Sequence, residues 1–270
     1  MSGGTVHPGA FPNGRRLRAL VDPLFELARG YSGLTAAVAG CFSSGERTFT
    51  LPRFRFVGPD AGHEPIRIGL FAGLHGDEWA GCAALAALAA SLAAGPGRAA
   101  GYELFLYPYC NPTGCEAGTR ENAAGRDLNR EFWRDSDQPE VRILETELRE
   151  RRFDGLITLH ADDTSDGLYG YTHGRVLNES LLKPALRAAE KILPCDRRDV
   201  IDGFSASESV ICDCFQGILS APPEQRPQPF DLIFETPAKA AFERQVCAAV
   251  AALEAILADY RGFIAYGQNI

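Results

Sequence analysis

Residues 66–78 of the chain read IRIGLFAGLHGDE, a stretch that combines a strand, a turn and the start of a helix. Ile66 to Gly73 is a nearly continuous apolar run, which predicts a strand covered on both faces by other parts of the protein. From about Asp77 to Ala94, apolar residues recur at the spacing of an amphipathic helix. Between the two elements, His75 and Glu78 lie three residues apart, just beyond the carboxyl end of the strand.

The same alternation of buried strands and helices continues along the chain. Further segments with strand or helix character are the strands Thr35–Phe42, Phe54–Val57, Leu104–Tyr107, Leu156–Leu159 and Leu232–Phe234, and the helices Pro139–Arg152, Leu181–Leu193 and a last one starting at Thr236-Pro237. Strands that alternate with helices predict an α/β fold, a three-layer sandwich around a mixed, largely parallel twisted sheet.

The chain is long enough for one large domain, and no polar linker divides it. Gly and Pro interrupt residues 1–34, so we expect an irregular N-terminal arm there, with a short helix near Pro23 to Arg29. Residues 35–270 are expected to form a single domain.

Composition and charge exclude several classes of function. The net charge of -8 argues against nucleic acid or an anionic membrane surface as a partner. No apolar run approaches the roughly 20 residues that span a bilayer. The first 18 residues lack the apolar core of a signal peptide, and the eight scattered cysteines suit buried thiols in a reducing compartment. We therefore expect a cytoplasmic protein.

Polar residues whose side chains can bind a metal or take part in catalysis follow several of the predicted strands. His75, Asn111, His160 and Glu235 each lie within a few residues of the carboxyl end of a strand. In open α/β sheets ligands bind beyond these ends, so the four residues are expected to share one edge and one site.

Two imidazoles and one carboxylate, from His75, Glu78 and His160, are the ligand set of an open hydrolytic zinc site. Taken singly, each could be a buried histidine or a helix-capping carboxylate. Their shared sheet edge favours a metal. Glu235 then remains as the general base toward a zinc-activated water, although a surface carboxylate near a helix N-terminus is the alternative.

A polar loop adds three candidates for substrate binding. Asn129 and Arg130 combine an amide with a planar guanidinium, which is shaped to bind a carboxylate at two points. Arg120, ten residues earlier, could polarise the scissile carbonyl, although a solvated loop arginine is nearly as plausible. Asp162 and Asp163 follow His160 and either shape the pocket or solvate a loop.

Together these residues resemble the M14 family of zinc carboxypeptidases, whose clan also includes succinylglutamate desuccinylase and aspartoacylase. The motifs that carry the resemblance are His75-x-x-Glu78, Asn111-Pro112-Thr113-Gly114, Arg120 separated by four residues from Gly125, Asp127-Leu128-Asn129-Arg130, His160 and Glu235. The resemblance covers about residues 65–260. It implies that His75, Glu78 and His160 bind one Zn²⁺ per chain and that Glu235 is the catalytic glutamate. It also implies that Asn129 and Arg130 hold the substrate's terminal carboxylate and that Arg120 polarises the carbonyl.

The leading hypothesis is a metallocarboxypeptidase that hydrolyses the C-terminal amide bond of peptides. The second is a zinc-dependent deacylase of an N-acyl amino acid, and the third is a catalytically silent zinc-binding domain, against which the intact Glu235 speaks. The spacing from Arg120 to Arg130 resembles the peptidases. The peptidases also place a substrate-covering tyrosine before the catalytic glutamate, but residues 172–259 contain none, and Tyr169 and Tyr171 are its possible replacements. Both enzymes require a substrate with a free carboxylate.

Overall fold

Four parallel strands form the centre of the fold, in the spatial order β4-β3-β5-β10. The computed structural model describes residues 15–62 and 64–267. The central strands are β3 (Ile66–Ala72), β4 (Tyr102–Tyr107), β5 (Gly155–Asp162) and β10 (Phe230–Pro237). Most of their residues are buried, as expected for central strands that are covered on both faces.

Antiparallel strands extend this centre on both sides into a ten-stranded sheet. On one side lies the hairpin of β1 (Leu34–Ser44) and β2 (Arg47–Val57), which pairs with β4. On the other side β6 (Tyr169–Thr172) pairs antiparallel with β10. The short strands β9 (Val210–Ile211), β8 (Phe204–Ser207) and β7 (Val200–Ile201) complete that edge. The parallel pairing is therefore confined largely to the centre of a mixed sheet.

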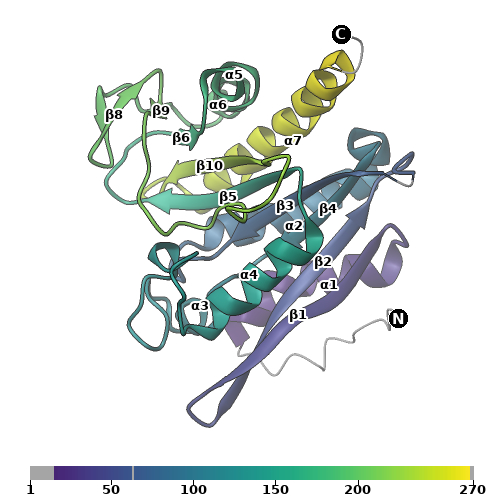
Figure 1. Cartoon of the computed structure of the whole chain (residues 1–270), viewed down its shortest axis with the longest axis vertical. Coiled ribbons are helices and arrows are strands. Elements are labelled where there is room, and N and C mark those ends of the chain that lie inside the picture. The colour runs from purple at the N-terminus through teal and green to yellow at the C-terminus, as the bar shows by residue number, and fades with distance from the viewer. Residues whose placement is uncertain (1–14, 63, 268–270) are drawn as a thin grey trace.

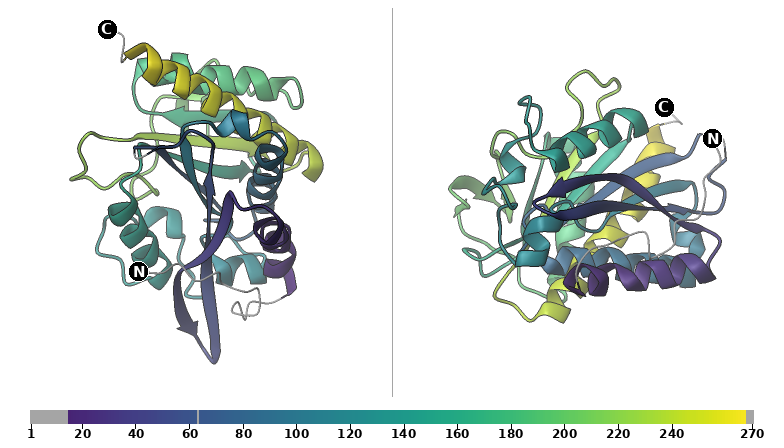
Figure 2. Two further views of the ribbon diagram at one scale, coloured as in Figure 1. Left: turned by 90° about the vertical axis from the view of Figure 1, so that its right-hand side faces the viewer. Right: turned by 90° about the horizontal axis from the view of Figure 1, so that it is seen from below.

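Helices cover both faces of the sheet and make the predicted three layers (Figures 1 and 2). One face is covered by α1 (Arg15–Gly30), α2 (Trp79–Ala94), α6 (Lys183–Glu190) and α7 (Phe242–Gly267), and the other by α4 (Pro139–Arg151). The alternation of side chains along β3 explains the two cores: Leu70 packs toward α2, and Phe71 packs toward α4. Short helical segments are η2 (Pro96–Ala99), α3 (Pro112–Ala117), η3 (Leu128–Arg130), α5 (Arg175–Leu177) and η4 (Asn178–Leu182).

The N-terminal segment differs from the irregular arm that the sequence predicts over residues 1–34. Residues 1–14 of that arm lie outside the described residues. Residues 15–30 form one helix, of which the expected Pro23–Arg29 segment is only the second half. Leu17, Val21, Leu24 and Phe25 recur at helical spacing and are buried against the core. Their burial outweighs the loss of one helical hydrogen bond at Pro23.

One other predicted helix begins elsewhere than expected. The last helix does not start at Thr236-Pro237, because both residues continue β10 and pair with Ala161 and Asp162 of β5; α7 begins at Phe242. The predicted helix over residues 181–193 is found as η4 and α6, with Pro184 as the second residue of α6.

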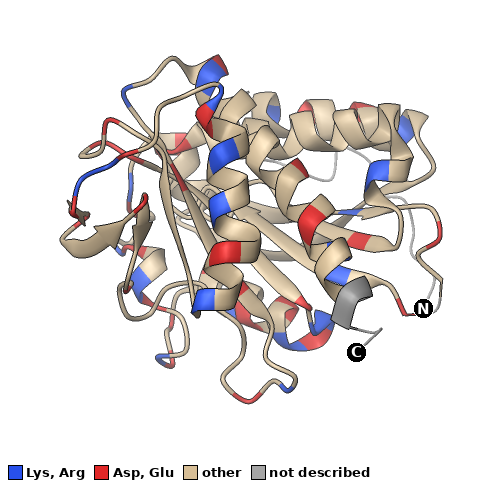
Figure 3. Ribbon diagram, turned by 90° about the horizontal axis from the view of Figure 1, so that it is seen from above, with Lys and Arg blue, Asp and Glu red and all other residues tan. Residues whose placement is uncertain are grey.

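Charged residues do not gather into a single basic face. In the view of Figure 3, acidic and basic positions are interspersed along the outer helices and loops. Among the helices of the described residues, none is both long enough and apolar enough to cross a bilayer.

Candidate metal centre

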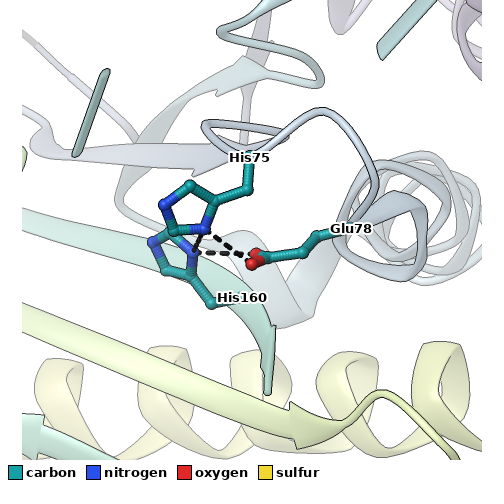
Figure 4. Close-up of side chains that lie close together, drawn as sticks. All are labelled: His75, Glu78 and His160. Carbon is teal, nitrogen blue, oxygen red and sulfur yellow. Dashed lines mark hydrogen bonds and ion pairs between the residues drawn. The ribbon is translucent and has the colours of Figure 1, made fainter. Parts of the chain in front are cut away.

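Three side chains converge at the carboxyl ends of β3 and β5 (Figure 4). His75 and Glu78 come from the turn that joins β3 to α2, and His160 comes from β5. His75 Nδ1 lies 2.6 Å from Glu78 Oε1, and His160 Nδ1 lies 2.9 Å from Glu78 Oε2. The two Nδ1 atoms are 3.2 Å apart. One ligand atom from each residue therefore fits around a single point, with all three within 4.8 Å of one another.

The local fold explains why these groups meet. β3 and β5 are parallel neighbours, with Ala72 paired to Leu159, so the residues after one strand lie beside the end of the other. The turn after β3 packs tightly against α3, and a Cβ on Gly76 would lie 2.0 Å from the carbonyl carbon of Gly114. Only glycine permits this approach, which fixes His75 and Glu78 on either side of it.

Hydrogen bonds on the far side of each imidazole orient the rings. His75 Nε2 lies 3.1 Å from Asp127 Oδ1, and His160 Nε2 lies 3.4 Å from the Asn129 side-chain amide. The Ala161 N–H donates to Glu78 Oε2 at 3.1 Å. Both Nδ1 atoms face the point that Glu78 also faces. At His75, Asp127 can accept the Nε2–H, which is the arrangement found when a histidine binds a metal through its other nitrogen.

The electrostatics of the cluster favour a positive charge between its members. Burial lowers the pKa of His75, but Glu78 and the hydrogen bond to Asp127 outweigh it and raise that pKa to about 9. Burial raises the pKa of Glu78, yet His160 and His75 hold it well below its usual range. Burial lowers the pKa of His160, although Glu78 opposes this shift. The raised pKa of His75 therefore shows that the cluster stabilises a positive charge at this point, as it would the charge of a bound cation.

Glu235 lies beside the cluster on β10, in register with His160 on β5. Burial raises its pKa well above the usual range, and the negative charges of Glu78, Asp162 and Asp202 add to this. No hydrogen bond or ion pair to its carboxylate is found among the residues that the structure describes. Glu235 is therefore a carboxyl group without an internal partner that faces the same cavity as the three clustered side chains.

Arg120 also reaches the cluster. Its guanidinium bonds Asp127 Oδ2 through Nη2 at 3.1 Å and Nε at 3.2 Å, and Nη1 lies 3.6 Å from Glu78 Oε1. The backbone carbonyl of Arg120 accepts from the Asn111 side chain at 3.2 Å. Asn111 itself caps α3 and does not line the cavity, so its role is to support the loop.

The two residues predicted to clamp a carboxylate are not equivalent. Asn129 is 5% exposed, and its Oδ1 accepts from the Leu219 N–H at 2.9 Å while its amide nitrogen faces His160. Its Oδ1 is thus engaged by the protein, whereas its amide nitrogen keeps a second N–H, and Asn129 lines the cavity together with Arg130. Arg130 stacks over the ring of Phe215 at 4.0 Å and donates from Nη1 to the backbone carbonyl of Asn129. Its other N–H groups are left to face the cavity.

The cavity around these residues has a volume of about 470 Å³. β6 brings both candidate tyrosines into it: Tyr169 pairs with Glu235 across the strands and donates to Asp162 at 2.9 Å, and Tyr171 lies beside Ile233. Asp162 and Asp163 also line the cavity, whereas His173 lies outside it. Cavity residues that the sequence did not single out are Asp202, Phe204, Ile211, Cys214, Phe215 and Ile218. Asp127 belongs to the Asp127-Leu128-Asn129-Arg130 motif, but the sequence predicted no separate role for it.

Comparisons with known proteins show a family model and solved structures to which the chain is similar. The model of the succinylglutamate desuccinylase/aspartoacylase catalytic domain matches residues 66–166, the stretch that carries all three clustered residues. A comparison with curated proteins gives no significant match.

Solved structures extend the likeness over most of the chain. One, described as a candidate metallopeptidase from Shewanella denitrificans, has a TM-score of 0.75 at 23% identity, covering 90% of this chain and 89% of the other. A metallo-carboxypeptidase from Burkholderia cenocepacia has a TM-score of 0.70 at 18% identity, with 92% and 69% covered. A succinylglutamate desuccinylase from a Silicibacter species reaches 0.57 at 18% identity, with 84% and 66% covered. The chain has the zinc carboxypeptidase-like fold, and the resemblance drawn from its motifs is confirmed.

Proposed function

We propose that the protein is a zinc-dependent metallocarboxypeptidase that hydrolyses the C-terminal amide bond of peptides. The observation that carries this proposal is the content of one cavity. It combines a cluster of two imidazoles and a carboxylate with an unpaired carboxyl group, Glu235, and two guanidinium groups, Arg120 and Arg130. Together these groups can support the hydrolysis of an amide bond next to a carboxylate.

His75, Glu78 and His160 would hold the metal, and their donors suit zinc because two nitrogens and one carboxylate oxygen leave a coordination position open. When bound, zinc supplies a Lewis acid that lowers the pKa of a water molecule and polarises a carbonyl. The positive charge that the cluster already favours supports this assignment.

Glu235 is the group that moves the proton. It accepts a proton from the attacking water and returns it to the leaving amine, which is the role of a carboxyl group with a raised pKa and no internal partner. Its position on β10, opposite His160 on β5, puts it at the edge of the cluster without making it part of the ligand set.

The arginines bind and polarise the substrate. Arg120 is held against the cluster by Asp127, so its guanidinium can face a carbonyl oxygen on which negative charge develops. Arg130 faces the cavity and pairs with the substrate's terminal carboxylate. Asn129, whose amide is engaged by Leu219 and His160, positions the His160 ring in this proposal.

A second candidate, a deacylase of N-acyl amino acids, is favoured by one observation: the family whose model matches residues 66–166 is that of desuccinylases and aspartoacylases. The two reactions use the same groups, since both break an amide bond whose nitrogen side carries a free carboxylate. They differ in what lies on the acyl side of that bond. Parallel assays with C-terminal peptides and with N-acyl amino acids decide between them: cleavage of the second set alone would select the deacylase.

The carboxylate requirement gives a direct prediction. Amidating the terminal carboxylate of a good substrate should lower kcat/KM by about 100-fold or more, because a hydrogen-bonded ion pair at Arg130 is lost. Arg130→Lys should lower kcat/KM by about 10-fold or more toward the free acid, since a point charge cannot reproduce the guanidinium fork. Steady-state kinetics on matched acid and amide substrates measure both. An amide cleaved as fast as the acid would exclude Arg130 as a carboxylate ligand.

The contact between Asp127 and His75 gives a second prediction. Asp127→Ala should weaken zinc binding by about 10–100-fold, because His75 loses the partner that fixes its ring. Competition with a chromogenic chelator measures the affinity. Asp259→Asn, at an exposed position on α7, is the matched control and should bind zinc like the unchanged protein. Equal affinity in Asp127→Ala would show that the hydrogen bond to His75 contributes nothing to metal binding.

A further inference from the structure

A second cavity of about 430 Å³ adjoins the one that holds the metal cluster. The two cavities share wall residues, namely Tyr171, Cys214, Phe215, Ile218 and Ile233, so they lie side by side, and we refer to the two together as the hollow. β10 runs along both. Its residues Asp231, Ile233 and Glu235 point to the same face of the sheet because side chains alternate along a strand. Glu235 lies at the metal end, and Asp231 lies in the second cavity, about 13 Å away along the strand.

Asp231 is a largely buried carboxylate that no positive charge compensates. It accepts one backbone N–H, that of Ala221, at 3.2 Å from either oxygen. Within residues 15–62 and 64–267, no basic side chain forms an ion pair with it. Arg134 and His173 line other walls of the cavity but are exposed. Burial raises the pKa of Asp231 to about 7, and only the Ala221 hydrogen bond opposes this.

The surroundings of Asp231 suit a long side chain that ends in a positive charge. Between the two ends of the hollow, the walls are formed by the rings of Tyr171 and Phe215 and by Ile233. Such walls favour the aliphatic stem of a lysine-like group, whose head carries the charge. Arg130, stacked on Phe215, lies at the junction and offers the opposite charge for a carboxylate.

We propose that Asp231 is the floor of a specificity pocket and that the residue released by hydrolysis carries a basic side chain, an ammonium or a guanidinium group. This inference rests on the proposed function and holds for both of its candidates, since a peptide and an N-acyl amino acid release the same kind of residue. Arg130 takes the carboxylate of that residue and Asp231 takes its side-chain cation. A buried carboxylate left without its partner discriminates strongly against neutral substrates.

The test compares substrates that differ only in the released residue. Benzoylglycyl-lysine, -arginine, -norleucine and -glutamate, and the corresponding N-acetyl amino acids, are assayed with the zinc-loaded protein. Lysine or arginine substrates should exceed the norleucine substrate in kcat/KM by about 10-fold or more. In Asp231→Asn the ratio of lysine to norleucine should fall by about 10–100-fold. Asparagine keeps an acceptor for the Ala221 N–H, so the pocket retains its shape.

Asp202→Asn is the discriminating variant, because Asp202 adds negative charge to the first cavity but does not line the second. If the preference for basic residues disappeared in Asp202→Asn and persisted in Asp231→Asn, general acidity of the cavity would explain it, and the proposal would be overturned. A norleucine substrate as good as lysine in the unchanged protein would overturn it too. Absence of hydrolysis across both substrate sets would instead contradict the proposed function.

A binding measurement keeps the inference testable if the variant folds poorly. Free lysine should bind the zinc-loaded protein at least about 10-fold more tightly than norleucine by calorimetry. Because the folded pKa of about 7 exceeds the unfolded value of about 3.9, the stability that protonated Asp231 contributes is complete at low pH and is lost between about pH 4 and 7. Asp231→Asn should therefore have the higher Tm above pH 7, and lysine should raise the Tm of the unchanged protein only. Equal binding of lysine and norleucine would refute the pocket.

Discussion

Glu235→Gln is expected to keep one zinc per chain and to lose about 10²–10⁴-fold in kcat, the contribution of general acid–base help. Glutamine has nearly the shape of glutamate but cannot accept the proton of the attacking water. The metal should remain because Glu235 stands outside the set formed by His75, Glu78 and His160. The measurement pairs elemental analysis of zinc with single-turnover kinetics on the best substrate found.

Glu235→Asp is the companion variant, since it keeps a carboxyl group but withdraws it by one methylene; it should retain more activity than Glu235→Gln. If Glu235→Gln kept nearly normal turnover, the base would have to be one of the other cavity carboxylates, and Asp162 and Asp163 would be tested first. If the unchanged protein bound zinc and cleaved nothing, the domain would be a silent zinc-binding relative, and Glu235 would have no catalytic role.

The centre of the fold could be predicted because its signals are local. The apolar run of β3, the turn with His75 and Glu78, and the helix after it occupy one continuous stretch. Parallel strands bring their carboxyl ends to one edge, so the position of His160 at the end of β5 followed from the class of fold. The convergence of His75, Glu78 and His160 could therefore be predicted from the sequence alone.

The far edge of the sheet could not be predicted, because its pairings are long-range and its strands are very short. β7 and β9 contain two residues each and are ordered by β8 and β6. No periodicity can appear in two residues. The sequence therefore did not identify the residues at and after these strands that line the two cavities, Phe215 among them.

Two residues show what a motif alone leaves open. Asn129 was predicted to bind the substrate's carboxylate, and its side chain also accepts from the N–H of Leu219, ninety positions away in the sequence. Asp127 stood in the same quoted motif without a role, although it contacts both His75 and Arg120. The identity of these residues was visible in the sequence. Their partners depended on how the loop from Arg120 to Arg130 packs, which is a tertiary property.

Loss of either histidine should have the largest effect of all. His160→Ala and His75→Ala should each strip the metal and abolish measurable hydrolysis, because zinc held by one imidazole and one carboxylate lacks the third ligand of a stable site. In each variant only one imidazole would remain, His75 beside Asp127 in His160→Ala and His160 beside Asn129 in His75→Ala. Zinc content after dialysis against a weak chelator, together with turnover, measures both losses.

A matched control separates ligand loss from general damage. His173 is exposed and stands outside the cluster. His173→Ala should therefore retain full zinc. Because a ligand that binds only the folded state stabilises it, added zinc should raise the Tm of the unchanged protein and of His173→Ala but not that of His160→Ala. Full zinc occupancy in His160→Ala would show that the metal lies elsewhere, and the shared sheet edge would then no longer support a single catalytic centre.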